Sequence, residues 1–404
     1  MQPLKGLKVI DLTKVLAGPL CGQYLGEYGA DVIKVETPDF GDETRRWLPQ
    51  DQGESAVFLA VNHNKRSLAL DLKTADGKKV IHELVKQADI VLQGYGGGTA
   101  QKLGVDYETL SAINPRLIYC EISGYGRSGP MGNEPGYDVM LQAFSGMLST
   151  MGFEGHYARA SFSPVDIGTA MHGLSGVLAA VLEREHTGQG VYLEASLLDT
   201  ALGFMTYMAQ SYWRTGINPK PMGTAHPSMS PYQAFDASDG TVMIGAGNDA
   251  QWRRFCAVAG LEAYVDHPDF VTNAIRMKNL IKTQALVQEA VGKKTVGEWV
   301  SLLSKANVPC APIHTLGQAL EHPQVAARGL IVDSVHPVLG PLKNIGHSVR
   351  YQNKDRTASK PPPLHGEHST SILTEAGFSD EYIEHLMQSG TVKQCVGSLQ
   401  KNKA

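Results

Sequence analysis

Asp166 is the residue whose type and position are best suited to covalent chemistry. It stands in SFSPVDIGTAMHG (161–173), at the start of a long helical pattern. The N-terminus of a helix favours negative charge, which would keep the carboxylate ionised and able to attack an electrophile. Aspartate is equally a favoured N-cap residue, and that structural role needs no chemistry. The local sequence therefore leaves a nucleophile and a cap as alternatives.

Backbone groups near the start of the chain offer a second kind of chemistry. The segment VLAGP (15–19) lies between an expected strand and an expected helix. Free N–H groups at such a helix start can receive a phosphate or a carbonyl oxygen. A strand-to-helix turn with Pro19 in the first helical turn explains the same residues without a ligand.

A group of basic residues could bind the phosphates of a nucleotide-like ligand. Its members lie near an expected strand at 67–72 and are Lys65, Arg66, Lys73, Arg45 and Arg46. Cationic side chains bind phosphate through charge-assisted hydrogen bonds. A solvated surface is the alternative explanation of these charges.

The segment GAGNDA (245–250) matches a dinucleotide-binding fingerprint between a strand-like and a helical pattern. A nicotinamide-binding unit needs an acidic residue about 20 positions later, at the end of a second strand. The chain instead has VDHPDF (265–270), which reads as a turn interrupted by proline. This favours an N-cap role for Asp249 over a dehydrogenase.

Other motifs that would indicate a metal site or a serine hydrolase do not occur in the sequence. The fourteen histidines are scattered, with one close pair at His365 and His368. The chain has no H-E-x-x-H, no P-loop and no G-x-S-x-G. Its five cysteines form no C-x-x-C, so we expect reduced thiols and no bound metal.

Alternating strand and helix patterns must position these residues. Strands are expected at 7–12, 31–36, 67–72, 89–93, 116–123 and 191–198, with helices at 76–88, 137–151, 166–188 and 201–216. This alternation predicts an α/β fold with a parallel sheet covered by helices. A Pro- and Gly-rich linker is expected at 216–231, a hairpin at 232–247, extended chain at 331–365 and a last helix at 378–390. We divide the chain into a first part of the large domain at 1–220, a small domain at 221–330, and a return to the large domain at 331–404.

Composition limits the classes of function. The 404 residues carry a formal net charge of −4, which gives no sign of a general nucleic-acid surface. The N-terminus shows no signal peptide, and no apolar stretch reaches the length expected of a membrane span. We therefore expect a cytoplasmic protein with no nucleic-acid and no membrane partner.

Taken together and in order, these segments resemble the family III CoA-transferases over essentially the whole chain. The segments that carry the resemblance are LAGPLCGQYLGEYGADVIKVE, GDETRRW, NHNKRSLALDLK, INPRLIY, ISGYGRSGP, YDVMLQAFSGMLSTMG, VDIGTAMHGLSGVLAAVLERE and PPPLHGEHSTSIL. The resemblance implies a large Rossmann-like domain built from both chain ends, a smaller middle domain and an interlocked homodimer. It implies CoA and acyl-CoA as substrates, with no permanently bound cofactor and no metal. CoA would pass from a donor such as succinyl-CoA or acetyl-CoA to a small carboxylic or dicarboxylic acid.

Residue by residue, the resemblance implies that Asp166 is the nucleophile, forming an aspartyl anhydride and then an aspartyl-CoA thioester. The positions matched to CoA contacts are Val15, Leu16, Ala17, Leu70, Lys73, Tyr95 and Lys102. The chain departs from many relatives at Gly94, which lacks their asparagine side chain, and at Thr37, which replaces an arginine. We do not find near 222–250 the run of glycines typical of the formyl-CoA:oxalate enzymes.

The acceptor acid is less constrained by the sequence. Candidate substrate residues are Tyr137, His156, Arg159 and His226, each of which could equally be structural. Arg159 is the best suited to a second carboxylate because guanidinium binds carboxylate through two hydrogen bonds. An α-methylacyl-CoA racemase of the same fold is an alternative, but Tyr137 replaces the histidine base of those relatives, and tyrosine is a poor base near neutral pH. A CoA-binding protein without turnover is a further alternative.

Overall fold

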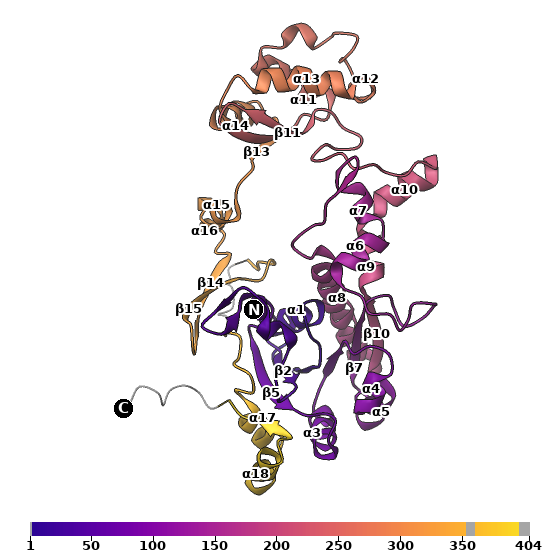
Figure 1. The fold of residues 1–404 in the computed structure, drawn as a ribbon, viewed down its shortest axis with the longest axis vertical. Helices are drawn as coiled ribbons and strands as arrows, with labels where there is room; N and C mark the ends of the chain where they lie inside the picture. The colour runs from indigo at the N-terminus through magenta and orange to yellow at the C-terminus, as the bar shows by residue number, and fades with distance from the viewer. Residues whose placement is uncertain (1, 353–359, 396–404) are drawn as a thin grey trace. The chain divides into compact units, whose positions relative to one another are not determined.

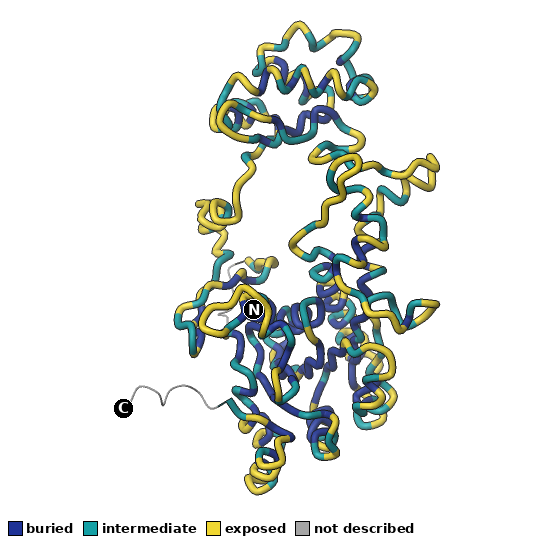
Figure 2. The backbone as a smooth tube through the Cα atoms, viewed as in Figure 1, coloured by how far each residue is buried: buried dark blue, intermediate teal, exposed yellow. Residues whose placement is uncertain are grey.

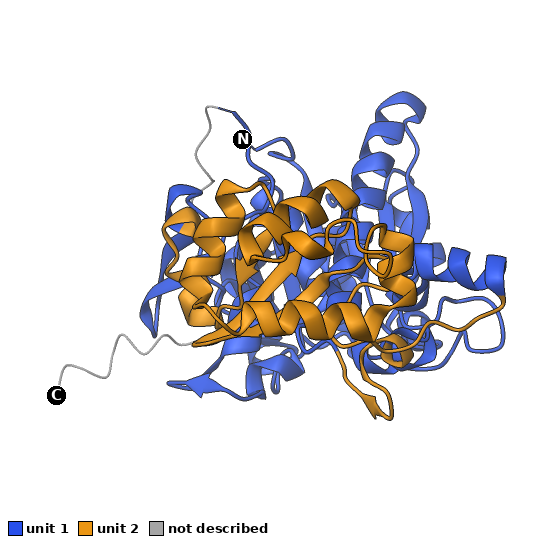
Figure 3. Ribbon diagram, turned by 90° about the horizontal axis from the view of Figure 1, so that it is seen from above, with its two compact units in different colours: residues 1–147, 160–215, 326–404 blue, residues 148–159, 216–325 orange. Residues whose placement is uncertain are grey.

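The computed structural model describes residues 2–352 and 360–395, and the chain divides into two compact units (Figure 3). The first unit consists of residues 1–147, 160–215 and 326–404, and the second of residues 148–159 and 216–325. Residues 353–359, within the stretch expected to be extended, and residues 396–404 lie outside the described residues.

A seven-stranded sheet forms the centre of the first unit, in the order β10-β7-β6-β1-β2-β5-β16 (Figure 1). Its strands are β1 (Lys8–Asp11), β2 (Asp31–Glu36), β5 (Lys65–Leu70), β6 (Ile90–Gln93), β7 (Ile118–Ser123), β10 (Val191–Ser196) and β16 (Val392–Lys393). The first six run parallel, and β16 pairs antiparallel with β5. The predicted α/β class and parallel sheet are confirmed, and both chain ends contribute strands.

Strand side chains alternate between two covered faces of this sheet. One face packs with α3 (Ala75–Lys86), α5 (Tyr107–Ile113), α17 (Ser369–Glu375) and α18 (Asp380–Gln388) around a core that includes Ile10, Ile33, Leu68 and Val91. Helices α1 (Ala17–Glu27) and α8 (Pro164–Thr187) pack on each other and against strands on the opposite face. Figure 2 shows the strands as the buried centre of this unit.

The winding of the sheet reverses beside β1. Strands β2 and β5 follow on one side of β1, and the chain then crosses to β6, β7 and β10 on the other. In open α/β sheets, ligands bind where the winding reverses, at the carboxyl ends of the strands. We therefore expect a ligand-binding site at the loops after β1 and β6.

Strand β5 begins at Lys65, two residues before the expected start. The sequence pattern placed the strand at the apolar residues alone. In the structure Lys65 is buried, and its ammonium group donates to Asp11 Oδ2 at 2.8 Å. A paired charge can therefore occupy a strand position that the pattern assigned to a loop.

The two helices expected around α8 are each broken. The pattern at 137–151 forms α6 (Asp138–Phe144) and α7 (Met147–Thr150), separated at Gly146, whose φ is +86°. The pattern at 201–216 begins earlier, as α9 (Leu197–Phe204), and continues as α10 (Thr206–Thr215). Glycine at positive φ explains the first break, because other residues rarely adopt that conformation.

Helix α8 contradicts the expectation that no segment reaches the length of a membrane span. It has 24 residues and is long and apolar enough to cross a membrane by length and composition. In this structure it packs against α1, β7 and β10. Its apolar composition is therefore explained in part by packing on a parallel sheet.

The remaining elements of the first unit are short. They are the 3-10 helix η1 (Glu43–Arg46), α2 (Ala56–Val61), α4 (Thr99–Leu103), α16 (Pro323–Ala327), the hairpin β3 (Gln50–Asp51) with β4 (Glu54–Ser55), and the hairpin β14 (Ile331–His336) with β15 (Gly340–Ile345). Helix α16 begins at the end of the second unit and ends in the first.

The second unit has an antiparallel three-stranded sheet of β11 (Tyr232–Ala237), β12 (Gly240–Gly245) and β13 (Cys310–Pro312). Its other elements are β8 (Gly152–Phe153), β9 (His156–Tyr157), α11 (Asp249–Ala259), η2 (Glu262–Tyr264), α12 (Asn273–Lys278), α13 (Leu280–Val291), α14 (Val296–Lys305) and α15 (Leu316–Leu320). The core is aromatic, with Trp252, Phe255, Phe270 and Trp299 buried together. The hairpin expected at 232–247 is present.

The antiparallel sheet removes the basis for dinucleotide binding at GAGNDA. A nucleotide-binding unit needs parallel strands joined by a crossover helix, whereas β12 pairs antiparallel with both neighbours. Asn248, not Asp249, caps α11 through a capping box with Gln251. Asp249 instead pairs with the buried Arg276 at 2.9 Å, which corrects the expected N-cap role.

Candidate active site

A cleft of about 250 Å³ lies in the first unit, beside the reversal of winding. The loops after β1 and β6 form part of its wall, as the strand order predicts. Asp166, at the start of α8, lines the same cleft. The residues predicted as functional that meet here are Val15, Leu16, Ala17, Tyr137 and Asp166.

Asp166 is the third residue of α8 and does not cap it. Ser163 occupies the N-cap position and Pro164 the first helical position. Within residues 2–352 and 360–395, no group donates a hydrogen bond to the Asp166 carboxylate. The N-cap role that the sequence left open for Asp166 is therefore not observed.

The start of α8 is capped instead by Asp138, the first residue of α6. Asp138 Oδ2 accepts hydrogen bonds from the backbone N–H of Val165 at 2.8 Å and of Asp166 at 3.1 Å. Its other oxygen, Oδ1, accepts from Gln142 Nε2. Asp138 therefore takes the helix N–H groups that the sequence analysis assigned to Asp166.

This arrangement changes the charge expected on Asp166. Burial, together with the negative charge of Asp138, raises the pKa of Asp166 to about 7. The helix N-terminus was expected to favour the ionised carboxylate, but burial and Asp138 outweigh that effect on its pKa. A carboxylate with a raised pKa is more basic, and hence a stronger nucleophile once it ionises.

The loop after β1 turns sharply at Val15, which has a φ of +70°. For a β-branched residue this is a strained conformation, and such strain clusters at functional sites. Helix α1 then begins at Ala17. In the described part of the chain, the backbone N–H groups of Leu16, Ala17 and Gly18 have no acceptor. They are available to an oxygen in the cleft.

Glycines allow the loops around the cleft to approach closely. A Cβ on Gly18 would lie 2.2 Å from Thr13 Cβ, and a Cβ on Gly124 would lie 2.7 Å from the backbone of Gly136. Gly124 follows β7 and Gly136 precedes α6, so their contact brings two walls of the cleft together. A larger residue at these positions would displace the loops.

A second cavity of about 400 Å³ shares Gly96 and Arg127 with the cleft. Tyr95 lines this cavity, and its carbonyl oxygen accepts from Arg127 Nη2 at 2.6 Å. Arg127 also pairs with Glu121. The two hollows therefore adjoin along the carboxyl ends of β6 and β7.

The other predicted CoA positions in the first unit line neither hollow. Leu70 is buried in the core on the α3 face of the sheet, so a contact from it would come from its backbone. Lys73 is exposed after β5. Lys102 is exposed near the end of α4, and its carbonyl oxygen accepts from Lys78 Nζ at 2.8 Å.

The basic group expected to meet phosphates is largely neutralised by protein carboxylates. Lys65 is buried against Asp11, and Arg45 donates twice to the buried Glu36, at 2.7 and 2.8 Å. Arg66 pairs with Asp31 and Glu375. Neither a phosphate site nor a solvated surface describes these three cations. Arg46 and Lys73 remain exposed.

Three predicted substrate residues belong to the second unit. His156 lies on β9 and is exposed, as is Arg159. Among described residues, nothing accepts a hydrogen bond from the Arg159 guanidinium. His226 packs its ring against Tyr232 at 5.3 Å, and its Nδ1 accepts from Ser228 N at 3.1 Å.

The sequence analysis missed the buried charges behind the cleft. Asp138, Lys34 and Asp42 are all buried and bonded to groups that line or adjoin it. Lys34 interrupts the apolar strand DVIKVE, which is a signal for a buried charge. The partner of such a charge depends on tertiary structure, so spacing alone does not reveal it.

Comparison with known proteins shows which family the chain matches. Residues 4–369 match the family model described as CoA-transferase family III. A human protein named succinyl-CoA:glutarate CoA-transferase is 36% identical over 397 residues, which cover 98% of this chain and 91% of the human protein. A protein of Agrobacterium fabrum named succinate–glutarate CoA-transferase is 35% identical, covering 92% of this chain and 95% of its own length.

The fold is similar to that of a solved structure as well. A protein of Brucella suis described as a CAIB/BAIF family protein is 35% identical, with a TM-score of 0.83. The likeness covers 93% of this chain and 99% of the Brucella chain.

Proposed function

The chain belongs to CoA-transferase family III, and from that premise we propose that it transfers CoA from succinyl-CoA to a small dicarboxylic acid through Asp166. One observation carries the proposal. Asp166 is a half-buried carboxylate with a pKa of about 7 that lines a cleft, and among the described residues neither it nor the nearby backbone N–H groups of Leu16, Ala17 and Gly18 has a hydrogen-bond partner. A nucleophile next to preorganised donors is the arrangement that acyl transfer requires.

The first step forms a mixed anhydride. A carboxylate oxygen of Asp166 attacks the thioester carbonyl carbon of succinyl-CoA, and the C–S bond breaks. CoA leaves as a thiolate, and the succinyl group remains bound to Asp166. The oxyanion that develops on the attacked carbonyl would be stabilised by the N–H groups of Ala17 and Gly18.

The second step moves CoA onto the protein. The thiolate attacks Asp166 Cγ and breaks its bond to the anhydride oxygen, which releases succinate and leaves an aspartyl-CoA thioester. An acceptor carboxylate then attacks this thioester and repeats both steps in reverse. Each step exchanges one acyl bond for another, so the thioester energy is conserved without a further reactant.

CoA would approach along the adjoining hollows of the first unit. The thioester end of CoA would lie against Val15, Leu16 and Ala17, and its pantetheine arm would pass Tyr95. Lys73, Lys102 and the backbone of Leu70 are the proposed contacts for the nucleotide end. Exposed ammonium groups suit phosphates because they retain charge without a protein partner.

The names of the relatives favour a dicarboxylate acceptor of about five carbons. Two relatives at 35–36% identity are named for succinate or succinyl-CoA and glutarate. Arg159 is the proposed contact for the second carboxylate of the acceptor, because a guanidinium binds a carboxylate through two hydrogen bonds. His156, His226 and Tyr137 are further candidates for substrate contact.

The test is CoA exchange measured with purified protein against a panel of mono- and dicarboxylic acids. We expect succinyl-CoA with glutarate to give the highest rate, and hydroxylamine to trap Asp166 during turnover. Proton exchange at the α-carbon in deuterated water without an acceptor, with no CoA transfer, would identify a racemase and contradict the proposal. Binding of CoA without turnover or adduct would also contradict it.

We further propose that the functional form is a homodimer. Helix α10 has no buried residue among its ten, and most of them are exposed (Figure 2). Only 39% of the most apolar window of α8 is buried. The large exposed apolar side chains of α8, α9 and α10 are Met171, Leu182, Leu202, Phe204, Tyr207, Tyr212 and Trp213. Extended apolar surface of this kind is typical of a protein interface.

Light scattering tests the dimer directly. We expect twice the mass of the chain, and we expect Trp213→Glu to shift the protein toward monomer. Leu48→Glu is a matched control, since Leu48 is 82% exposed and lies away from these helices in the sequence. A monomeric wild type would contradict the proposal.

A further inference from the structure

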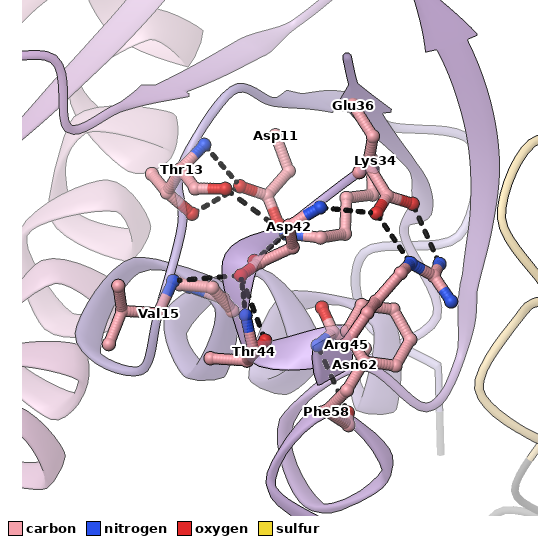
Figure 4. Close-up of polar contacts among 12 residues, drawn as sticks. Asp11, Thr13, Val15, Lys34, Glu36, Asp42, Thr44, Arg45, Phe58 and Asn62 are labelled. Atoms are coloured by element: carbon pink, nitrogen blue, oxygen red, sulfur yellow. Dashed lines mark hydrogen bonds and ion pairs between the residues drawn. The ribbon is translucent and has the colours of Figure 1, made fainter. Parts of the chain in front are cut away.

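A pair of buried charges lies directly behind the strained loop of the cleft (Figure 4). Lys34, in the middle of β2, pairs with Asp42 at 2.8 Å, and neither side chain is exposed to solvent. Burying two charges costs desolvation that their attraction often fails to repay, so such a pair is weak evidence for stability. Its other contacts must therefore be considered.

Both members of the pair bind the backbone of the same loop. Lys34 Nζ donates to Thr13 O at 3.0 Å, and Asp42 Oδ1 accepts from Val15 N at 3.4 Å. These two contacts bracket Lys14 and end at the residue with positive φ. The free N–H groups of the cleft follow immediately, at Leu16 and Ala17.

Asp42 is itself fixed from the other side. It accepts from Thr44 N at 3.0 Å and from Thr44 Oγ1 at 2.8 Å, while its own N–H donates to Glu36 Oε2 at 3.0 Å. Glu36 is in turn bound by Arg45 (Figure 4). The carboxylate of Asp42 therefore has little freedom to follow the loop if the loop relaxes.

The charges on this pair are maintained inside the protein. Although burial would raise the pKa of the Asp42 carboxyl, Lys34 holds it below its ordinary value. Burial would likewise lower the pKa of Lys34, but Asp42 and Asp11 raise it. Lys34 therefore remains a donor to Thr13 O across the physiological pH range.

We propose that Lys34 and Asp42 are positioning residues, which hold the Thr13–Leu16 backbone in the strained conformation that directs its N–H groups into the cleft. This inference rests on the proposed function, because it assigns the loop to transition-state stabilisation. Neither side chain lines the cleft. Without the pair, Val15 would relax from positive φ and the following N–H groups would turn away.

The test compares Lys34→Met with the double variant Lys34→Met/Asp42→Asn. The single variant leaves a buried carboxylate unpaired and is expected to lower stability. The double variant removes both charges and keeps the acceptor oxygen for Val15, so it is expected to fold. Arg184→Met is the matched control. Arg184 is a buried cation that pairs at 2.9 Å with Asp89, the residue before β6. Neither residue lines the cleft.

We expect the double variant to lose about 10- to 100-fold in kcat, as misplaced donors do, with KM for acyl-CoA changed less than about threefold. The rate of hydroxylamine-trapped adduct should fall by the same factor. Arg184→Met should lower stability yet keep kcat within about twofold of the wild type. A double variant with wild-type kcat would overturn the inference while leaving the proposed function intact. A wild type without CoA transfer would overturn both.

Discussion

The two units of this chain both have an apolar core, but they differ in the charged side chains that they bury. Besides its apolar core, the first unit buries Asp11, Lys34, Glu36, Asp42 and Lys65, which lie on or near β1, β2 and β5. The second buries five large aromatic rings, with Arg276 as the fully buried cation within its described residues. Apolar burial stabilises a fold at low cost, whereas buried charges need defined partners. We infer that the first unit uses part of its folding free energy to fix geometry, and the second uses its core for stability.

The first prediction tests whether the first unit fixes the geometry of a catalytic site. Asp166→Ala should abolish CoA transfer, with a loss of at least ~10³-fold in kcat, because it removes the carboxylate that we propose forms the anhydride. CoA binding measured by calorimetry should remain. Asp199→Asn is a matched control, since Asp199 also lies in the first turn of a helix, α9, but is exposed and outside the cleft. Turnover by the Asp166 variant would contradict the assigned chemistry.

The next effect concerns the aromatic core. Trp299 has no exposed surface, and its indole N–H donates to Val291 O at 2.8 Å. Trp299→Ala should lower the free energy of unfolding by about 3–5 kcal/mol, measured by denaturant titration. Ile281→Ala, at a side chain 83% exposed on α13, should change it by less than about 0.5 kcal/mol. If Trp299→Ala lowered the free energy of unfolding only slightly, the aromatic core would not be the source of the second unit's stability.

A third effect concerns the ionisation of Asp166. Attack needs the carboxylate, and the pKa of Asp166 is raised to about 7 by burial and by Asp138. The value of kcat/KM should therefore rise about tenfold for each pH unit below 7 and level off above it. An exchange assay between pH 5 and 9 measures this. A rise centred near pH 4 would mean that the nucleophile is an ordinary exposed carboxylate.

The smallest effect is the stability cost of that same residue. Because the pKa of Asp166 is raised on folding, ionisation favours the unfolded chain, and stability falls as pH rises from about 4 to about 7. Asp166→Asn should gain about 1–2 kcal/mol over the wild type at pH 8, after allowance for partial exposure, and little at pH 4. Thermal unfolding at the two pH values measures the difference. An equal gain in stability at both pH values would show that the ionisation of Asp166 is not its cause.

The sequence predicted the first unit well where pattern and position suffice. Strands β1, β2, β6 and β7 lie within the expected ranges, because apolar runs bounded by turn residues define a buried parallel strand. The end of α8 before Gly188 follows from a glycine at positive φ. Helices broken at Gly146 and Met205 were predicted as continuous, since helical periodicity persists across a single break.

The sequence predicted which residues meet in the cleft, but not how their contacts set the chemistry of Asp166. Asp166 and the 15–17 loop meet in one cleft, as the order of the strands requires. The cap from Asp138 and the raised pKa of Asp166 depend on a contact between residues 28 positions apart. The roles of Lys34 and Asp42 depend on burial and on backbone strain, which residue types do not reveal.

The two-residue strand β16 has a consequence for how the chain is made. It covers the outer edge of β5, and Ile372, Leu373, Ile383 and Leu386 from α17 and α18 complete the core against α3. These residues are synthesised after the whole second unit. The first two hundred residues are therefore synthesised well before one edge of their sheet is covered and one hydrophobic face is completed. Truncations near the C-terminus should therefore act on solubility during synthesis, even though they remove no residue of the cleft.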